Sequence, residues 1–211
     1  MDSTQVTRQG ANSNMRSKVD VRKMTVTAML SAVAFVLMFL DTAVPIMPSF
    51  IKLDLSELPA LMASFALGSV WGIMVCLIKN ILHLTMTQTG GVGELSNFIL
   101  GVSFVLPAGL IYQHRKTKKS AIIGAVSGAL VMAVISFPSN LYIVYPFYYN
   151  FMAKDAIIGA YQAIAPFWNI DSIEKCLLMF NVPFTFVKGM LSVIITLLIY
   201  QPLRPLLKGN D

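Results

Sequence analysis

Charged residues are scarce in this sequence. Only 12% of its 211 residues are charged, about half the usual share in a soluble domain. The two cysteines, Cys76 and Cys176, are too few to staple a chain of this length. The apolar content of 56% excludes a disordered chain. With a mean hydropathy of +0.70, the composition predicts an integral membrane protein.

Several catalytic signatures are missing as well. There is no Walker A sequence, so ATP hydrolysis by that route is excluded. The two histidines, His83 and His114, fall on opposite sides with no cysteine at ligand spacing, so we expect no metal site. Aromatic residues lie in the apolar segments and not among the basic ones, which argues against nucleic-acid binding. We expect a protein without catalytic residues; the rival is a small intramembrane enzyme using Glu94 with His83 or Lys79.

Six apolar segments are candidates for membrane-spanning helices, each of which needs roughly 20 mostly apolar residues. They are 24–39 (extending to 44), 57–67, 70–86, 95–112, 121–144 and 173–200. The segments are continuously apolar, which argues against a transmembrane β-barrel. The second is short and runs into the third, so we expect a short or tilted pair there. The sequence predicts an all-α integral membrane protein with six transmembrane helices.

Basic residues gather on one side of these predicted spans. Eleven of the 16 lysines and arginines lie in the N-terminal segment, at 115–119 and near the C-terminus. The positive-inside rule therefore predicts cytoplasmic termini in a multi-pass protein of the cell membrane. Residues 1–21 lack the apolar core of a signal peptide, and we interpret them as a mobile cytoplasmic tail. Residues 22–207 form the predicted six-helix transmembrane domain.

The last predicted span carries a polar stripe. Asn181, Thr185 and Lys188 are spaced i, i+4, i+7 and therefore share one helical face. Polar groups inside spans usually line a cavity or bind a partner. The alternative is hydrogen bonding between helices. A mid-span ammonium demands the stronger reason, so Lys188 is a candidate ligand contact. Asn140, near the outer end of the fifth span, is another.

The third span and the start of the fourth repeat this pattern. Lys79 and His83 are neighbours at i, i+4, and an ion pair between Lys79 and Glu94 is the structural alternative to ligand binding. The stretch 89–97 is a glycine-rich turn that enters a helix. Such a turn lets a ligand approach the backbone closely, and the helix start offers free N–H groups. Gly93, Glu94 and Asn97 are the candidate contacts in it.

The outer connections are unusually apolar and aromatic. The segment 44–54 is stiffened by prolines and could fold over a pocket as a lid, with the candidate lid residues Pro48, Phe50, Leu53 and Asp54. Between the fifth and sixth spans lie Tyr145, Phe147, Tyr148, Tyr149 and Trp168. We interpret these as interfacial belt residues, or as rings that stack on a flat ligand. In the first span, Ala28 and Ala32 favour close helix contact, either internal or with another membrane subunit.

The combination of these motifs resembles the substrate-binding subunits (S-components) of energy-coupling-factor (ECF) vitamin transporters, and most closely the riboflavin-specific members. The resemblance covers about residues 22–206. Its carriers are the segments 79–84, 90–98 and 106–112, Asn140 with 145–146, and 181–189.

The resemblance implies six helices, cytoplasmic termini and a pocket near the outer leaflet closed by the first loop. It implies that Ala28 and Ala32 form a docking motif for a coupling membrane subunit, which works with two ATP-binding-cassette ATPases. The subunit would capture riboflavin outside and topple in the lipid bilayer to deliver it inward. Riboflavin would be the transported ligand, and no cofactor is implied.

In the riboflavin members, asparagines and a lysine of the last two helices meet the flavin, which Asn140 and Lys188 match. Thr185 stands where a further asparagine is expected, and Asn181 is placed to supply that contact. Ring carbonyls and N–H would suit these groups, and ribityl hydroxyls would suit Glu94 and Asn97. The lid would then cover the dimethylbenzene end of the ring system.

Two further points stay open on this scaffold. Lys79, as one of the few charges inside the spans, is retained among the candidate contacts. The ligand could also be another vitamin or a phosphorylated flavin, for which Lys52 is the basic residue near the pocket mouth.

Overall fold

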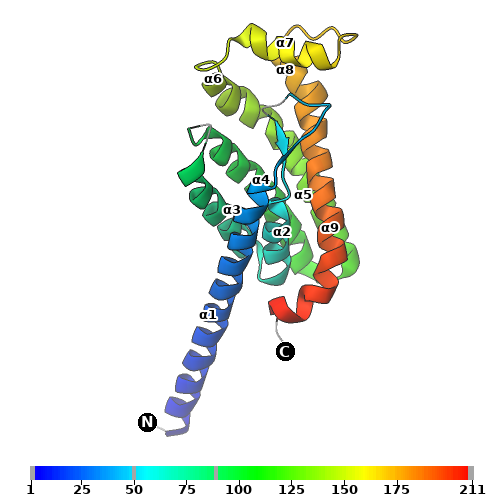
Figure 1. Ribbon diagram of the computed structural model, residues 1–211. Coiled ribbons are helices and arrows are strands. Elements are labelled where there is room, and N and C mark those ends of the chain that lie inside the picture. The colour runs from blue at the N-terminus through cyan, green and yellow to red at the C-terminus, as the bar shows by residue number, and fades with distance from the viewer. Residues whose placement is uncertain (1–2, 49–50, 88–89, 209–211) are drawn as a thin grey trace.

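A computed structural model describes residues 3–48, 51–87 and 90–208, with side chains described between 21 and 200 (Figure 1). The helices are α1 (Ser3–Phe39), α2 (Glu57–Ala66), α3 (Ser69–His83), α4 (Val92–Arg115), α5 (Lys118–Ser139), α6 (Tyr145–Tyr148), α7 (Lys154–Ile164), α8 (Ile173–Cys176) and α9 (Val182–Lys208). Shorter elements are the 3₁₀ turn η1 (Leu84–Met86), the π turns η2 (Asn140–Val144) and η3 (Leu177–Asn181), and the antiparallel strands β1 (Thr42–Ala43) and β2 (Lys52–Leu53). The predicted all-α membrane class is confirmed.

In the part of the chain that the structure describes, five helical segments are long and apolar enough to cross a membrane. They are 21–39, 69–86, 92–115, 118–148 and 173–200. The remaining predicted span corresponds to α2, whose 10 residues extend about 15 Å, half of the roughly 30 Å hydrocarbon core. The expected short helix is therefore present as a buried element, and the count of six crossings is not confirmed.

Both chain ends lie at the same end of the bundle, opposite α7 (Figure 1). This arrangement agrees with the prediction that both termini share one side of the membrane, and the cytoplasmic assignment stays a prediction. The helix α1 begins at Ser3 and is continuous to Phe39, so it contains most of the predicted N-terminal tail. The mobility of that tail and the domain boundaries at 21 and 207 stay predictions.

The centre of the bundle is built around α2. Nearly every residue of α2 is buried, because the helix packs against α1, α3, α4 and α9. Beside it, α4 and α5 make the most extensive helix pair. Their backbones approach closely at two glycines: a Cβ on Gly124 would lie 2.6 Å from the Ala108 carbonyl oxygen, and one on Gly128 would lie 2.4 Å from that of Phe104. Small residues at this spacing are what allow such contact in membranes.

A second apolar cluster closes the end of the bundle that carries α7. It joins η2, α7 and the start of the last span through Val144, Tyr145, Ile157, Tyr161 and Ile173. Tyr145 is only 1% exposed, so its interpretation as an interfacial belt residue was wrong. Its hydroxyl finds buried partners there, as described below. Trp168 is half exposed, which suits a belt position.

Because α4 and α5 approach so closely, even the methyl side chain of alanine should not fit at position 128. A Gly128→Ala substitution should lower the melting temperature of the purified protein by about 5 °C, because overpacking costs about 1–3 kcal/mol. Gly159→Ala in α7 is the matched control, since a Cβ there meets no atom within 4 Å. Equal melting temperatures for the two variants, measured by scanning fluorimetry, would contradict this packing.

Candidate functional site

Two adjoining chambers lie between the glycine turn, the last two spans and the β1–β2 ribbon. The outer chamber has a volume of about 610 Å³, and the inner one about 190 Å³. Lys52, Gly93, Asn97 and Tyr148 line both chambers, so the two form one continuous site. Four of the predicted contacts line the inner chamber but not the outer one: Asn140, Asn181, Thr185 and Lys188. Glu94 lines the outer chamber alone.

The two asparagines of the inner chamber occupy irregular helical turns. Asn140 begins the π turn η2 and Asn181 ends the π turn η3. Single π turns inside helices often occur at functional sites, because the extra residue redirects the side chains around it. One turn further along, Thr185 and Lys188 continue the same inward face. The three residues of the predicted polar stripe therefore line the same chamber, and their part in ligand binding stays a prediction.

A buried hydrogen-bond network fixes the amide of Asn181. The Tyr161 hydroxyl donates to Oδ1 of Asn181 at 2.7 Å, and Nδ2 of Asn181 donates to the Tyr145 hydroxyl at 3.3 Å. The two tyrosine hydroxyls also bond each other. Burial raises the pKa of Tyr161 well above its ordinary value, so its hydroxyl remains a donor. The network links α7 to the inner chamber and sets the direction in which Asn181 can offer its amide.

The glycine turn shapes the opposite wall. Gly90 and Gly91 have φ values of 60° and 91°, a conformation that glycine adopts without steric cost. The chain can therefore turn sharply into α4 and present Gly93, Glu94 and Asn97 to the chambers. The carboxylate of Glu94 is held on both sides. His83 Nδ1 lies 2.7 Å from Oε1, and the Thr87 hydroxyl donates to Oε2 at 2.9 Å.

The lid segment is tied to the bundle by paired charges. The Lys188 ammonium donates to Oδ2 of Asp54 at 2.7 Å. Ser56 donates its hydroxyl proton to the other oxygen of Asp54 and accepts a hydrogen bond from Lys79 at 2.7 Å. Burial alone would raise the pKa of Asp54, but the nearby ammonium groups of Lys188 and Lys79 hold it below its usual value.

Lys79 has a different partner from the one expected. Its ammonium lies 2.8 Å from the Glu57 carboxylate, and both side chains are essentially fully buried. The ion pair between Lys79 and Glu94, which was the structural alternative to ligand binding, is not formed, because Glu94 is bound by His83 and Thr87. Lys79 also lines neither chamber. Among the described contacts, its role is structural: it holds the start of α2 and the lid.

The predicted lid residues have unequal places. Asp54 lines the outer chamber and carries the ion pair. Pro48 is buried and Leu53 is half-buried in β2, and neither lines a chamber. Phe50 lies outside the described residues. Ala28 and Ala32, the predicted docking pair, are both exposed on the outside of α1, and their docking role stays a prediction.

Sequence reasoning missed Ser56, Glu57 and Tyr161 as parts of the site, and it considered Tyr145 only as a belt residue or a stacking ring. One signal could have found Glu57: a lysine in mid-span needs a counter-ion, and Glu57 opens the next helix after the lid. The tyrosines give no comparable signal, because their meeting depends on how the outer connection folds back. Tyr148, considered only as a stacking ring, lines both chambers.

The fold and the site define a class: a multi-pass membrane protein with a binding site near one end of its bundle, lined by both polar and apolar side chains. Comparison with known proteins narrows it. Residues 22–200 match the family model described as "ECF transporter, substrate-specific component". The chain belongs to this family of ECF substrate-specific components, which are subunits of transporters and not enzymes.

Named relatives agree with this assignment. "Riboflavin transporter RibU" of Staphylococcus aureus (strain TCH60) is 32% identical over 92% of this chain and 98% of the relative. "Riboflavin transporter FmnP" of Bacillus subtilis (strain 168) is 30% identical over 88% and 93%. A solved structure described as "Structure and mechanism of the S component of a bacterial ECF transporter" superposes with a TM-score of 0.72. It is 31% identical and covers 90% of this chain and 99% of its own.

The pairing of Lys79 predicts strong coupling to Glu57 and none to Glu94. Glu57→Leu should destabilise the protein by about 3–5 kcal/mol, because it leaves a buried ammonium unpaired. The double variant Glu57→Leu/Lys79→Met should recover most of that loss, since an apolar pair replaces the ion pair. Thermal or denaturant unfolding in detergent measures both.

The matched cycle combines Glu94→Gln with Lys79→Met. These changes should add with an interaction energy near zero, as for residues that share no partner. A large coupling in the Glu94 cycle, or none in the Glu57 cycle, would show that Lys79 is paired otherwise.

Proposed function

We propose that this chain is the riboflavin-binding subunit of an ECF-type vitamin importer. It captures riboflavin at the outer face and passes it inward together with a coupling membrane subunit and two ATP-binding-cassette ATPases. The family assignment and the riboflavin transporters among its relatives support this proposal. The inner chamber is the observation that carries it.

The inner chamber offers the hydrogen-bonding groups that an isoalloxazine ring needs. Its walls bring two amides, a hydroxyl and an ammonium together from η2, η3 and α9. The ring presents two carbonyls, ring nitrogens and an N–H on one edge, which match amide and ammonium partners. Phe184 and Tyr148 supply aromatic surface in the same chamber, which suits the flat faces of the ring.

The sizes of the chambers give the ligand an orientation. The inner chamber is smaller than the roughly 300–1,000 Å³ usual for small-molecule sites, so the ligand must extend into the outer one. The polar edge of the ring belongs with Asn140, Asn181 and Lys188. The ribityl hydroxyls then reach Asn97, which lines both chambers, and Glu94 beyond it.

Lys188 connects ligand capture to the lid. Its ammonium lines the inner chamber and also bonds Asp54 of the lid segment. A ligand carbonyl beside Lys188 and the Asp54 carboxylate would therefore be held by the same group. A site closed in this way keeps water from the ligand while the subunit delivers it. The exposed pair Ala28 and Ala32 leaves α1 open to the coupling subunit.

The inner chamber predicts which variants lose riboflavin. Asn140→Ala and Lys188→Ala should each weaken binding by about 10- to 100-fold, since a buried ligand group left unpaired costs about 1–3 kcal/mol. Fluorescence titration of purified protein with riboflavin measures the dissociation constant.

Asn169→Ala and Lys154→Ala are matched controls, because these exposed residues of the outer connection line neither chamber. They should bind like the unmodified protein. Unchanged affinity in both Asn140→Ala and Lys188→Ala would sink the assignment of the inner chamber.

The outer chamber predicts a preference for riboflavin over its phosphate. Asp41, Asp54 and Glu94 line it, whereas its basic side chains are Lys52 and His83. Lys52 is bound to Asp41 at 2.9 Å, and His83 to Glu94. A phosphate at the end of the ribityl chain would meet more negative than positive charge, so FMN should bind more weakly than riboflavin.

Asp41→Asn should lower the ratio of the dissociation constants of FMN and riboflavin by about fivefold. The substitution frees Lys52 to bind the phosphate, which strengthens FMN binding by about 1 kcal/mol. Asp155→Asn, which removes an equal charge from the exposed start of α7, should leave the ratio of the two dissociation constants unchanged. Tighter binding of FMN than of riboflavin by the unmodified protein would contradict this reading of the outer chamber.

A further inference from the structure

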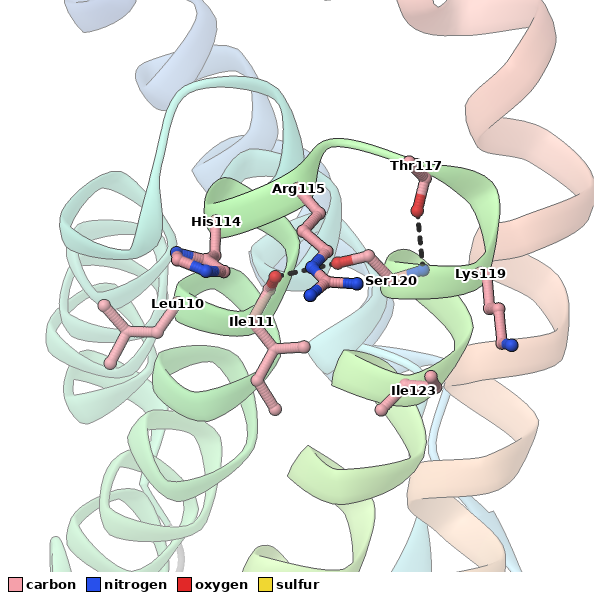
Figure 2. Close-up of a pocket in the computed structure, with 8 residues that line it drawn as sticks. All are labelled: Leu110, Ile111, His114, Arg115, Thr117, Lys119, Ser120 and Ile123. Carbon is pink, nitrogen blue, oxygen red and sulfur yellow. Dashed lines mark hydrogen bonds between the residues drawn. The ribbon is translucent and has the colours of Figure 1, made fainter.

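A third cavity lies at the opposite end of the bundle from the two chambers. Its volume is about 660 Å³, and it is formed where α4 ends and α5 begins (Figure 2). The helix α4 starts at the glycine turn beside the chambers, so its last residues reach the other end. Three basic side chains, His114, Arg115 and Lys119, line this basic cleft. The cleft shares no residue with the riboflavin site.

The positive charge of the basic cleft is not neutralised by the described part of the chain. The described carboxylates all belong to the opposite half: four surround the chambers and three lie between residues 155 and 174. Among the described side chains, His114, Arg115 and Lys119 are exposed and enter no ion pair. Such a cluster attracts an anion, and the start of α5 adds the positive end of a helix dipole.

The floor of the basic cleft is rigid. The Thr117 hydroxyl accepts a hydrogen bond from the Ser120 backbone at 3.1 Å and caps α5. The Ser120 hydroxyl donates to the Ile111 carbonyl at 2.7 Å. In the view of Figure 2, the Arg115 side chain lies between those of His114 and Lys119.

The walls of the basic cleft become apolar one turn away from the loop. Leu110 and Ile123 precede and follow the basic residues by one helical turn, and both are about half exposed on the outside of the bundle. Ile111 completes this apolar part. A ligand in the cleft would therefore meet cations at the loop and hydrocarbon surface toward the middle of the membrane.

We propose that the basic cleft binds an anionic phospholipid from the leaflet on the basic side, with its phosphate on Arg115 and Lys119. Basic pockets between helices on the cytoplasmic side of membranes are suited to anionic headgroups. A guanidinium and an ammonium form strong charge-assisted hydrogen bonds with phosphate oxygens. The acyl chains continue along Leu110 and Ile123. A soluble anion would use the basic groups and leave this apolar wall without a role.

Native mass spectrometry of the full chain in detergent, titrated with phosphatidylglycerol or phosphatidylcholine, tests the proposal. The unmodified protein should bind phosphatidylglycerol about tenfold more tightly than phosphatidylcholine. Arg115→Gln/Lys119→Gln should lose about tenfold in affinity for it. The matched control is Lys116→Gln/Lys118→Gln, which removes the same charge from the same loop but from residues that do not line the cleft. It should lose less than about threefold, and both variants should keep their melting temperature and riboflavin affinity.

Four results would overturn the assignment. Equal losses in the two double variants would mean general attraction to the basic surface. Equal affinities for the two lipids would show that the cleft does not recognise the anionic headgroup. Displacement of phosphatidylglycerol by millimolar inorganic phosphate would indicate a soluble-anion site. If the Arg115→Gln/Lys119→Gln variant no longer bound the coupling subunit but still bound lipid as before, the cleft would be a contact for that protein.

Discussion

The cost of placing a charge in a membrane interior governs this structure. Two ammonium groups, on Lys79 and Lys188, lie within spans, where an unpaired charge is expensive. Each is neutralised by a carboxylate at or just before the start of α2: Glu57, the first residue of α2, pairs with Lys79, and Asp54 of the lid segment pairs with Lys188. Ser56 bonds both Lys79 and Asp54. The need to pair these charges therefore pins the lid and the start of α2 over the binding site.

Much of this was predictable from one-dimensional patterns. Long apolar runs gave the helices, and the i, i+4, i+7 spacing on the last span placed three polar side chains on the inner chamber wall. The pairing of Lys79 was not predictable, because several acids were within reach in sequence and only packing selects Glu57. The short α2 and the two π turns at Asn140 and Asn181 depend equally on tertiary contacts. The tyrosines that orient Asn181 come together because the segment with α7 folds back onto the bundle. No local sequence pattern predicts the path of that segment.

The two ends of the molecule have complementary electrostatic roles. At the end that carries the chambers, Lys52, Lys79 and Lys188 are each paired with a carboxylate, so the chambers present directed hydrogen bonds to a neutral vitamin. At the other end, the basic residues lack described counter-ions and face the surface where anionic lipid is expected.

The visible absorption spectrum of the purified, unmodified protein tests the central claim most directly. After expression in cells supplied with riboflavin, the account predicts a yellow protein with flavin absorption bands in near-equimolar amount, or a colourless one that acquires them when riboflavin is added. A preparation that stays folded, is colourless and shows no change in the spectrum or fluorescence of added riboflavin would contradict it.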